Sequence, residues 1–174
     1  AQVIVVDTNI PPESIAWLAE NVKLPIFADP VSTAKAEKLR PVLGKLHTLK
    51  PNRLEAELLS GVAITDQKSL DKAVDVLLGT GLRRVFISLG ADGVYAAAHN
   101  HRLHVPCCPG TMVNTTGCGD AAMAAIAWAY LEGTGLEGTA RAAMAAGSIA
   151  MESAETINPD MSAQALKARA EQLQ

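Results

Sequence analysis

The stretch of this sequence with the clearest potential for chemistry is VNTTGCGD at residues 113–120, which runs directly into the alanine-rich segment 121–131. A small, glycine-broken loop that feeds a helix leaves backbone N–H groups without partners, and together with the helix dipole these groups favour an anion. Gly117 and Gly119 allow close approach of the backbone to a ligand. Asp120, beside such a site, is suited to handling a proton, although Asp is also a favoured helix N-cap.

Composition restricts the class of protein. The chain has 174 residues, of which 49% are hydrophobic, 19% charged and 3% aromatic, with a formal net charge of -3. These values are typical of one globular domain with a hydrophobic core, and they exclude disordered and fibrous classes. The charge gives no reason to expect nucleic acid or an anionic membrane as a partner. No apolar run is long enough for a membrane span or a signal peptide.

Cysteine and histidine usage argues against a metal centre. Cys107 and Cys108 are adjacent, the third cysteine is Cys118, and the four histidines are scattered. No CxxC spacing indicates zinc, and an odd number of cysteines is typical of the reducing cytoplasm, where we expect this protein. The chain opens at Ala1 almost directly into a strand pattern, so we expect it to be the C-terminal piece of a longer protein.

Strand and helix patterns alternate along most of the chain. The expected strands are residues 3–6, 25–28, 45–49 and 85–89, followed by a hairpin of 94–98 and 103–105. The expected helices are residues 12–22, 33–43, 55–59, 66–78, 121–131, 136–151 and 162–173. This alternation predicts right-handed crossovers and a parallel sheet in one α/β domain over residues 1–174.

Polar residues and glycines follow the expected strands. They are Asp7, Asn9, Asp29, Asn52, Ser88, Gly90 and Gly93. Because ligands bind at the carboxyl ends of parallel strands, we expect these residues to open onto one edge, which the loop at 117–120 can also reach. This convergence favours a phosphate site over simple helix capping.

Three segments, in this order, resemble the PfkB or ribokinase family of small-molecule kinases. They are KPNRLE at 50–55, SLGADG at 88–93 and NTTGCGD at 114–120. The resemblance implies a ribokinase-like three-layer α/β/α fold with a mostly parallel sheet and an edge hairpin. It also implies transfer of the γ-phosphate of ATP, with Mg²⁺, to a hydroxyl of a small molecule.

The resemblance also implies a role for each matched position. Asp120 corresponds to the general base, and the amides of Gly117, Cys118 and Gly119 to the anion hole for the transferring phosphoryl group. Asn52 and Glu55 correspond to the pair that places Mg²⁺, largely through water, and the nucleotide phosphates. The remaining cofactor-binding positions are Ser88, Gly90 and Gly93 under the nucleotide, and Met144, Ser148 and Asn158 around adenine.

Each assignment has a structural alternative. Asn52 could be an ordinary helix cap and Glu55 a solvated carboxylate of the first turn. Ser88 could be a strand-end hydroxyl, the glycine turn after it a hairpin connection, and Asn158-Pro159 a common turn. Met144 could belong to the core of its helix.

The sequence departs from the family pattern at two positions. Asn114 stands where the family often has Asp, a position that in many members helps to bind a monovalent cation, so dependence on K⁺ is left open. Cys118 replaces a small Ala. We expect the helix terminus to lower the pKa of this thiol and to make it open to alkylation.

The acceptor is predicted from resemblance alone. Passages 27–32, 146–150 and 155–159 look most like the branch of the family that phosphorylates the 5′-hydroxyl of pseudouridine. Another ribose-like sugar or nucleoside is the alternative. The sugar-binding half and lid of such kinases are expected N-terminal to this chain, so a nucleotide-binding piece without catalysis, or one that self-associates as a homodimer, also stays open. A dinucleotide-dependent oxidoreductase is disfavoured because no GxGxxG follows the first strand.

Overall fold

The computed structural model describes residues 1–108, 110 and 112–173. The chain falls into two compact units, which are described separately below. Unit 1 comprises residues 1–89 and 97–102, and unit 2 comprises residues 90–96 together with the chain from Leu103 onward. The single domain over residues 1–174 stays a prediction.

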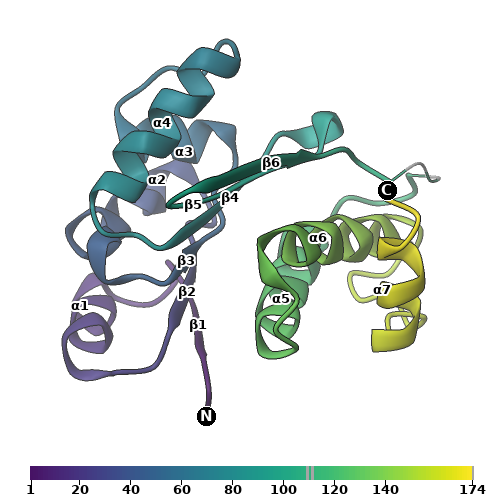
Figure 1. Ribbon diagram of the computed structural model, residues 1–174. Helices are drawn as coiled ribbons and strands as arrows, with labels where there is room; N and C mark the ends of the chain where they lie inside the picture. Colours follow the sequence, from purple (N-terminus) through teal and green to yellow (C-terminus); the bar gives the residue numbers. More distant parts are fainter. Residues whose placement is uncertain (109, 111, 174) are drawn as a thin grey trace. The chain divides into compact units, whose positions relative to one another are not determined.

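Unit 1 is built from strands that alternate with helices. In chain order these are β1 (Ile4–Asp7), α1 (Pro12–Asn21), β2 (Ile26–Asp29), α2 (Thr33–Ala36), η1 (Glu37–Lys45), β3 (Thr48–Leu49), α3 (Arg53–Ser60), α4 (Gln67–Gly79) and β4 (Arg84–Ser88). The strands β1 to β4 pair in parallel and in sequential order. Right-handed crossovers in that order place all the connecting helices on one face, and Figure 1 shows α1 to α4 on one side of the strands.

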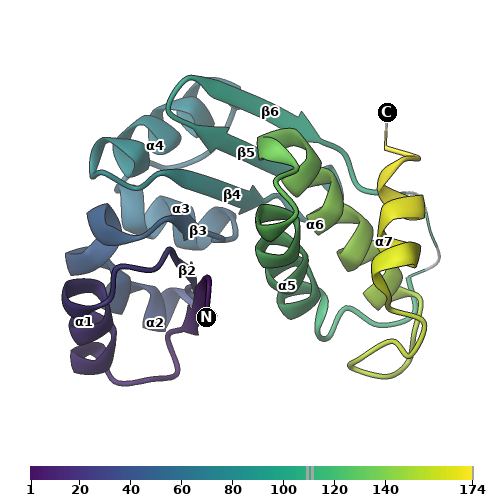
Figure 2. The same cartoon turned by 60° about the horizontal axis from the view of Figure 1, so that its bottom comes forward.

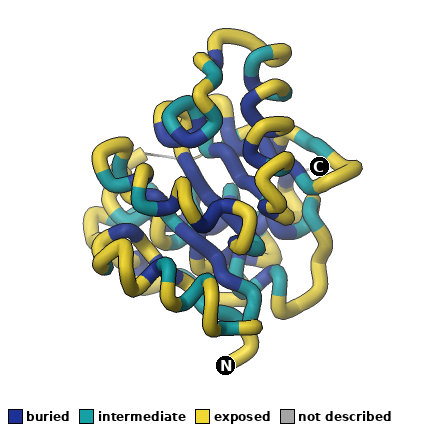
Figure 3. The backbone as a smooth tube through the Cα atoms, turned by 90° about the vertical axis from the view of Figure 1, so that its left-hand side faces the viewer, coloured by how far each residue is buried: buried dark blue, intermediate teal, exposed yellow. Residues whose placement is uncertain are grey.

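The strands of unit 1 carry its core. Phe27, Leu49 and Phe86 have no exposed surface, and the buried stretches in Figure 3 follow these strands and the inner faces of the helices. Parallel strands that are covered by crossover helices are expected to be apolar in this continuous way. The core therefore fixes the strands, and their polar ends are free to serve a site.

A hairpin extends the sheet beyond β4. The chain continues through η2 (Gly90–Asp92) into β5 (Val94–Ala98) and β6 (His101–Val105), and the strand order is β1-β2-β3-β4-β5-β6. β6 is thus the last strand, so the predicted edge hairpin is confirmed.

The helices of unit 2 pack through alanine. They are α5 (Cys118–Leu131), α6 (Gly135–Met151) and α7 (Ala163–Ala170), and Figure 2 shows them beside one another. Their shared core consists of Ala125, Ala129, Ala142, Ala145, Ala146 and Leu166. Small side chains let helix backbones approach closely, which explains why this half of the chain is rich in alanine. Among the described helices, none is both long and apolar enough to cross a membrane.

The segment between β2 and β3 differs from the sequence prediction. The helix expected over residues 33–43 is α-helical only at Thr33–Ala36 and continues as a 3-10 helix over Glu37–Lys45. Pro41 lies inside this segment; it has no N–H to donate, and its ring collides with the carbonyl four residues earlier in an α-helix. In addition, Val31 has a φ of 64°, which is unusual for a β-branched residue.

Candidate active site

The carboxyl ends of the strands in unit 1 meet at one edge, as the parallel arrangement requires. Asp7 and Asp29 are paired in register at the ends of β1 and β2. Asn52 and Ser88 form an isolated parallel bridge, and the Ser88 amide donates to the Pro51 carbonyl at 2.9 Å. The predicted nucleotide residues Asn52 and Ser88 are therefore neighbours.

Asn52 and Glu55 form a capping box at the start of α3. The Glu55 amide donates to Asn52 Oδ1 at 2.9 Å, and the Asn52 amide donates to Glu55 Oε2 at 2.8 Å. The capping role that the sequence left as an alternative for Asn52 is therefore present. Glu55 is only 3% exposed, so the alternative of a solvated carboxylate is wrong.

An ion pair lies close to Glu55, and sequence reasoning missed it. Lys50 Nζ lies 2.9 Å from Asp29 Oδ2, and both side chains are largely buried. Burial raises the pKa of Glu55; its hydrogen bond from the Asn52 amide lowers it, the nearby Asp29 raises it and Lys50 lowers it. Asp29 and Lys50 belong to different strand ends, and only the parallel register of β2 and β3 brings them together.

The glycine loop of unit 2 opens α5 without a side-chain cap. Gly117 is the N-cap residue with a left-handed φ of 84°, and no side chain accepts a hydrogen bond from the first turn. The Cys118 amide donates to the Thr115 carbonyl at a long 3.3 Å. Among the described residues, the amides of Gly119 and Asp120 have no acceptor. The helix therefore presents free donors at its positive end, as an anion site needs.

Gly117 and Asp120 have different structural constraints. A Cβ at Gly117 would lie 2.4 Å from the Thr156 carbonyl oxygen, so only glycine fits between the loop and the segment that follows α6. The Asp120 side chain is exposed in the first turn of α5. It makes no hydrogen bond or ion pair with the described residues, so its carboxylate is available to a ligand.

The prediction that the helix terminus lowers the pKa of the Cys118 thiol is wrong. Burial raises the pKa of its thiol above the ordinary value, and its hydrogen bond to backbone only partly opposes this. The Sγ atom lies 4.0 Å from the Asn114 carbonyl oxygen, inside the loop. Desolvation of the thiolate thus outweighs the helix dipole here.

The turn after β4 depends on its two glycines. Gly90 and Gly93 have left-handed φ values of 65° and 94°, and the Gly93 amide donates to the Gly90 carbonyl at 3.1 Å. A Cβ at Gly93 would lie 2.1 Å from the Val105 carbonyl oxygen, whereas nothing lies within 4 Å of a Cβ at Gly90. Gly93 is thus required for packing on β6, and Gly90 leaves open space beside the backbone.

The predicted adenine residues lie on and after α6. Met144 is half-buried, while Ser148 and Asn158 are buried. Ser148 Oγ accepts from Arg169 Nη1 at 2.6 Å, and Asn158 Nδ2 donates to the Ile149 carbonyl at 2.6 Å. Both side chains are therefore held in place by the protein itself.

Of these three residues, Asn158 lines a pocket of about 520 Å³, whereas Met144 and Ser148 do not. Asn158 and Asp160 line it from the segment after α6, and Arg169 lines it from α7. Arg169 also donates to both carboxylate oxygens of Glu152, at 2.8 and 3.1 Å, and this hydrogen bonding lowers the pKa of Glu152. Sequence reasoning missed this contribution of the tail helix, because a single arginine in an amphipathic segment carries no motif.

The residues of each unit fit the groups that a kinase would need. Among the described residues, no three His, Cys, Asp or Glu side chains gather into a metal-binding group. Magnesium in phosphate-transfer sites needs less, since one or two carboxylates and the phosphates themselves usually suffice. Glu55 has one oxygen beyond the capping box, and the open start of α5 fits a phosphate. That both units serve one site stays a prediction.

Comparison with known proteins identifies the family. Residues 12–163 match the pfkB family carbohydrate kinases. The chain is 40% identical over 165 residues to the pseudouridine kinase of Escherichia coli K12, which covers 93% of this chain and 52% of that protein. The chain belongs to the pfkB family.

Solved structures confirm the fold class. The ribokinase of Thermotoga maritima superposes with a TM-score of 0.83 at 26% identity, over 98% of this chain and 57% of that one. Phosphofructokinase-2 from Escherichia coli, solved with potassium, gives 0.82 at 23% identity, over 98% and 56%. The predicted ribokinase-like α/β fold is therefore correct. The chain spans about half the length of the curated relatives it matches.

Proposed function

We propose that this chain is the nucleotide-binding and catalytic part of a kinase that transfers the γ-phosphoryl group of ATP to a hydroxyl of a sugar or nucleoside. The observation that carries the proposal is the open start of α5, with free amides at Gly119 and Asp120 and an exposed carboxylate on the same turn. Membership of the pfkB family supports the reaction class.

The residues of the loop have complementary tasks in this mechanism. The amides of Gly117 and Gly119 hold the anionic phosphoryl group as charge develops on it, and the Cys118 amide joins them once its long 3.3 Å hydrogen bond to the Thr115 carbonyl opens. Asp120 accepts the proton of the incoming hydroxyl and orients its oxygen for attack. ATP bound with Mg²⁺ supplies the phosphoryl group and the neutralising charge.

Residues outside the loop position the nucleotide. Glu55 would hold Mg²⁺ through water, and Asn52 fixes Glu55 through the capping box. Ser88 and Gly90 would lie along the phosphates and ribose. Ser148 and Asn158, each held by an internal hydrogen bond, together with Met144 would border the base.

Pseudouridine is the proposed acceptor, through its 5′-hydroxyl, because the pseudouridine kinase is 40% identical to this chain. The likeness to a ribokinase makes ribose the second candidate. Both acceptors are free small molecules, so the proposed reaction involves no nucleic acid polymer. Turnover of Mg-ATP with pseudouridine, uridine and ribose, by the whole encoded polypeptide that carries these residues, decides between them.

Replacement Asp120→Asn tests the catalytic assignment. We expect kcat to fall by about 10²–10⁴-fold, the usual contribution of a general base. Stability should fall by less than about 1 kcal/mol, because the side chain is exposed and only its favourable charge at the N-terminus of α5 is lost. Glu171→Gln, which removes another exposed carboxylate of unit 2, should leave kcat unchanged.

Two outcomes would contradict the proposal. If Asp120→Asn keeps kcat within about tenfold of the wild type, Asp120 is not the base. If Mg-ATP raises the melting temperature of the polypeptide but no acceptor is phosphorylated, the chain is a nucleotide-binding piece without catalysis.

A further inference from the structure

The glycine loop lies against the end of α6 and the segment that follows it, and Val113 and Asn114 make the hydrogen bonds. Within unit 2, the amides of Val113 and Asn114 donate to the Met151 carbonyl at 2.8 and 3.2 Å. The side chain of Asn114 adds a third link, because its Nδ2 donates to the Ala154 carbonyl at 3.2 Å. The loop that presents the free amides is thus held directly on residues 151–156.

Both ends of the Asn114 side chain are committed. Its Oδ1 accepts a hydrogen bond from the Thr116 amide at 3.0 Å, while its Nδ2 faces the Ala154 carbonyl. The Thr116 amide can only donate and the Ala154 carbonyl can only accept. The two neighbours therefore fix the orientation of the side-chain amide, with its NH₂ group toward Ala154.

This geometry does not fit a monovalent cation. A hard cation at this position needs oxygen ligands, as an aspartate together with backbone carbonyls would provide. Here the Asn114 NH₂ group points at the Ala154 carbonyl and donates a hydrogen bond to it. The partial positive charge of this group thus occupies the place beside the carbonyl that a cation would need. The neutral side chain also supplies no charge to offset the desolvation of an ion.

We propose that the Asn114 amide stands in place of a monovalent cation, so that the glycine loop is fastened to residues 151–156 without K⁺. The hydrogen bond to Ala154 performs the bridging, and the protein's stability is then insensitive to the identity of the monovalent ion. The consequence for phosphoryl transfer rests on the proposed function, whereas the consequence for stability does not.

The test compares thermal unfolding of the whole encoded polypeptide in KCl and in tetramethylammonium chloride at equal ionic strength. For the wild type we expect equal melting temperatures in the two salts, within about 1 °C. For Asn114→Asp we expect a melting temperature lower by about 2–4 °C in tetramethylammonium, which K⁺ restores, because the carboxylate then lacks a partner. Asn100→Asp adds the same charge in the exposed turn between β5 and β6 and should show no response to K⁺.

Either of two results overturns the proposal. One is a wild-type melting temperature that is several degrees higher in KCl than in tetramethylammonium chloride. The other is an Asn114→Asp variant that folds but does not respond to K⁺. If Asn114→Asp does not fold in either salt, the wild-type comparison alone decides. Absence of kinase activity in both salts would contradict the proposed function and leave the stability result as it stands.

Discussion

Helices α3 and α5 both begin at segments that were assigned to ligand binding, but their first turns differ. At α3, Asn52 and Glu55 satisfy each other's amides in a closed capping box. At α5, Gly117 offers no side chain, and the amides of Gly119 and Asp120 have no acceptor among the described residues. A helix that caps itself has little left for an anion, whereas an uncapped one needs an external acceptor.

Under the proposed function, this difference separates a motif that contacts the reacting group from one that acts at a distance from it. The α5 start presents donors and a free carboxylate. The α3 start instead presents a rigid, buried Glu55, whose remaining oxygen is its only free acceptor. The first is suited to bind the reacting group, and the second to orient a hydrated ion. The following replacements test this contrast, beginning with the largest effect.

Gly117→Ala, at the uncapped start of α5, should have the largest effect on stability. The new Cβ would meet the Thr156 carbonyl at 2.4 Å in a left-handed conformation, so we expect a loss of about 3 kcal/mol in the free energy of unfolding, measured by urea denaturation. Gly133→Ala is the matched control, because Gly133 has a φ of 71° with nothing within 4 Å. It should cost only about 1 kcal/mol. Equal losses would mean that the contact with Thr156 is not tight.

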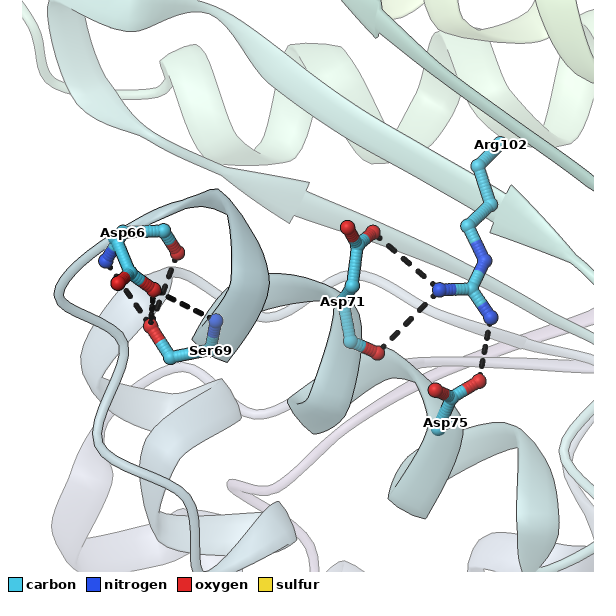
Figure 4. A network of polar contacts seen from close by, with 5 residues as sticks. All are labelled: Asp66, Ser69, Asp71, Asp75 and Arg102. Atoms are coloured by element: carbon cyan, nitrogen blue, oxygen red, sulfur yellow. Dashed lines mark hydrogen bonds and ion pairs between the residues drawn. The ribbon is translucent and has the colours of Figure 1, made fainter.

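Asn52→Ala, at the capped start of α3, should have an intermediate effect on stability. We expect a loss of about 1 kcal/mol in stability, because the Glu55 amide loses its acceptor. Asp66→Ala is the control, since α4 also begins with a capping box, in which the Ser69 amide donates to Asp66 at 2.7 Å (Figure 4).

Kinase assays on the same two variants separate capping from function. Both should lose similar stability in urea denaturation, yet only Asn52→Ala should weaken the use of Mg-ATP. A loss of activity that is the same in both variants would reduce Asn52 to a cap alone.

Glu55→Gln should have the smallest effect on stability. Glutamine keeps an oxygen that can accept from the Asn52 amide, so the free energy of unfolding at pH 7 should stay within about 1 kcal/mol of the wild type. Because the pKa of Glu55 is raised on folding, the folded state binds its proton more tightly than the unfolded state. Its contribution to stability is therefore present at low pH and is lost as pH rises through the folded pKa.

That pH dependence supplies the measurement. Denaturation between pH 4 and 8 should show it in the wild type and not in Glu55→Gln, while the demand for Mg²⁺ in kinase assays rises in the variant. An unchanged Mg²⁺ requirement would contradict the assignment of Glu55.

The sequence predicted the fold well because its signals are local. The alternation of apolar runs with helical patterns gave the four parallel strands, the hairpin and the order of the helices. The long helix expected at residues 33–43 failed because Pro41 tightens it into a 3-10 helix. This 3-10 helix runs on to Lys45, so the strand expected at residues 45–49 begins only at Thr48.

Candidate site residues could be named from the sequence only where a motif marks them. The glycine loop and the Asn52 segment could be proposed because the residues of each are close in sequence. The Lys50–Asp29 pair and the Arg169–Glu152 pair were not, because each joins residues that only the tertiary packing brings together. The pKa of Cys118 was predicted in the wrong direction because the sequence does not reveal how far the thiol is desolvated.

The backbone at Val31, just after β2, is conformationally strained. Its φ of 64° follows Asp29-Pro30, where the Val31 amide donates to Asp29 Oδ1 at 2.9 Å. A β-branched residue pays a conformational penalty there that glycine would avoid. The backbone beside the Asp29 carboxylate is therefore strained. Relaxation of residues 29–31 would move the Asp29 oxygens, and with them the paired Lys50 and the electrostatic surroundings of Glu55.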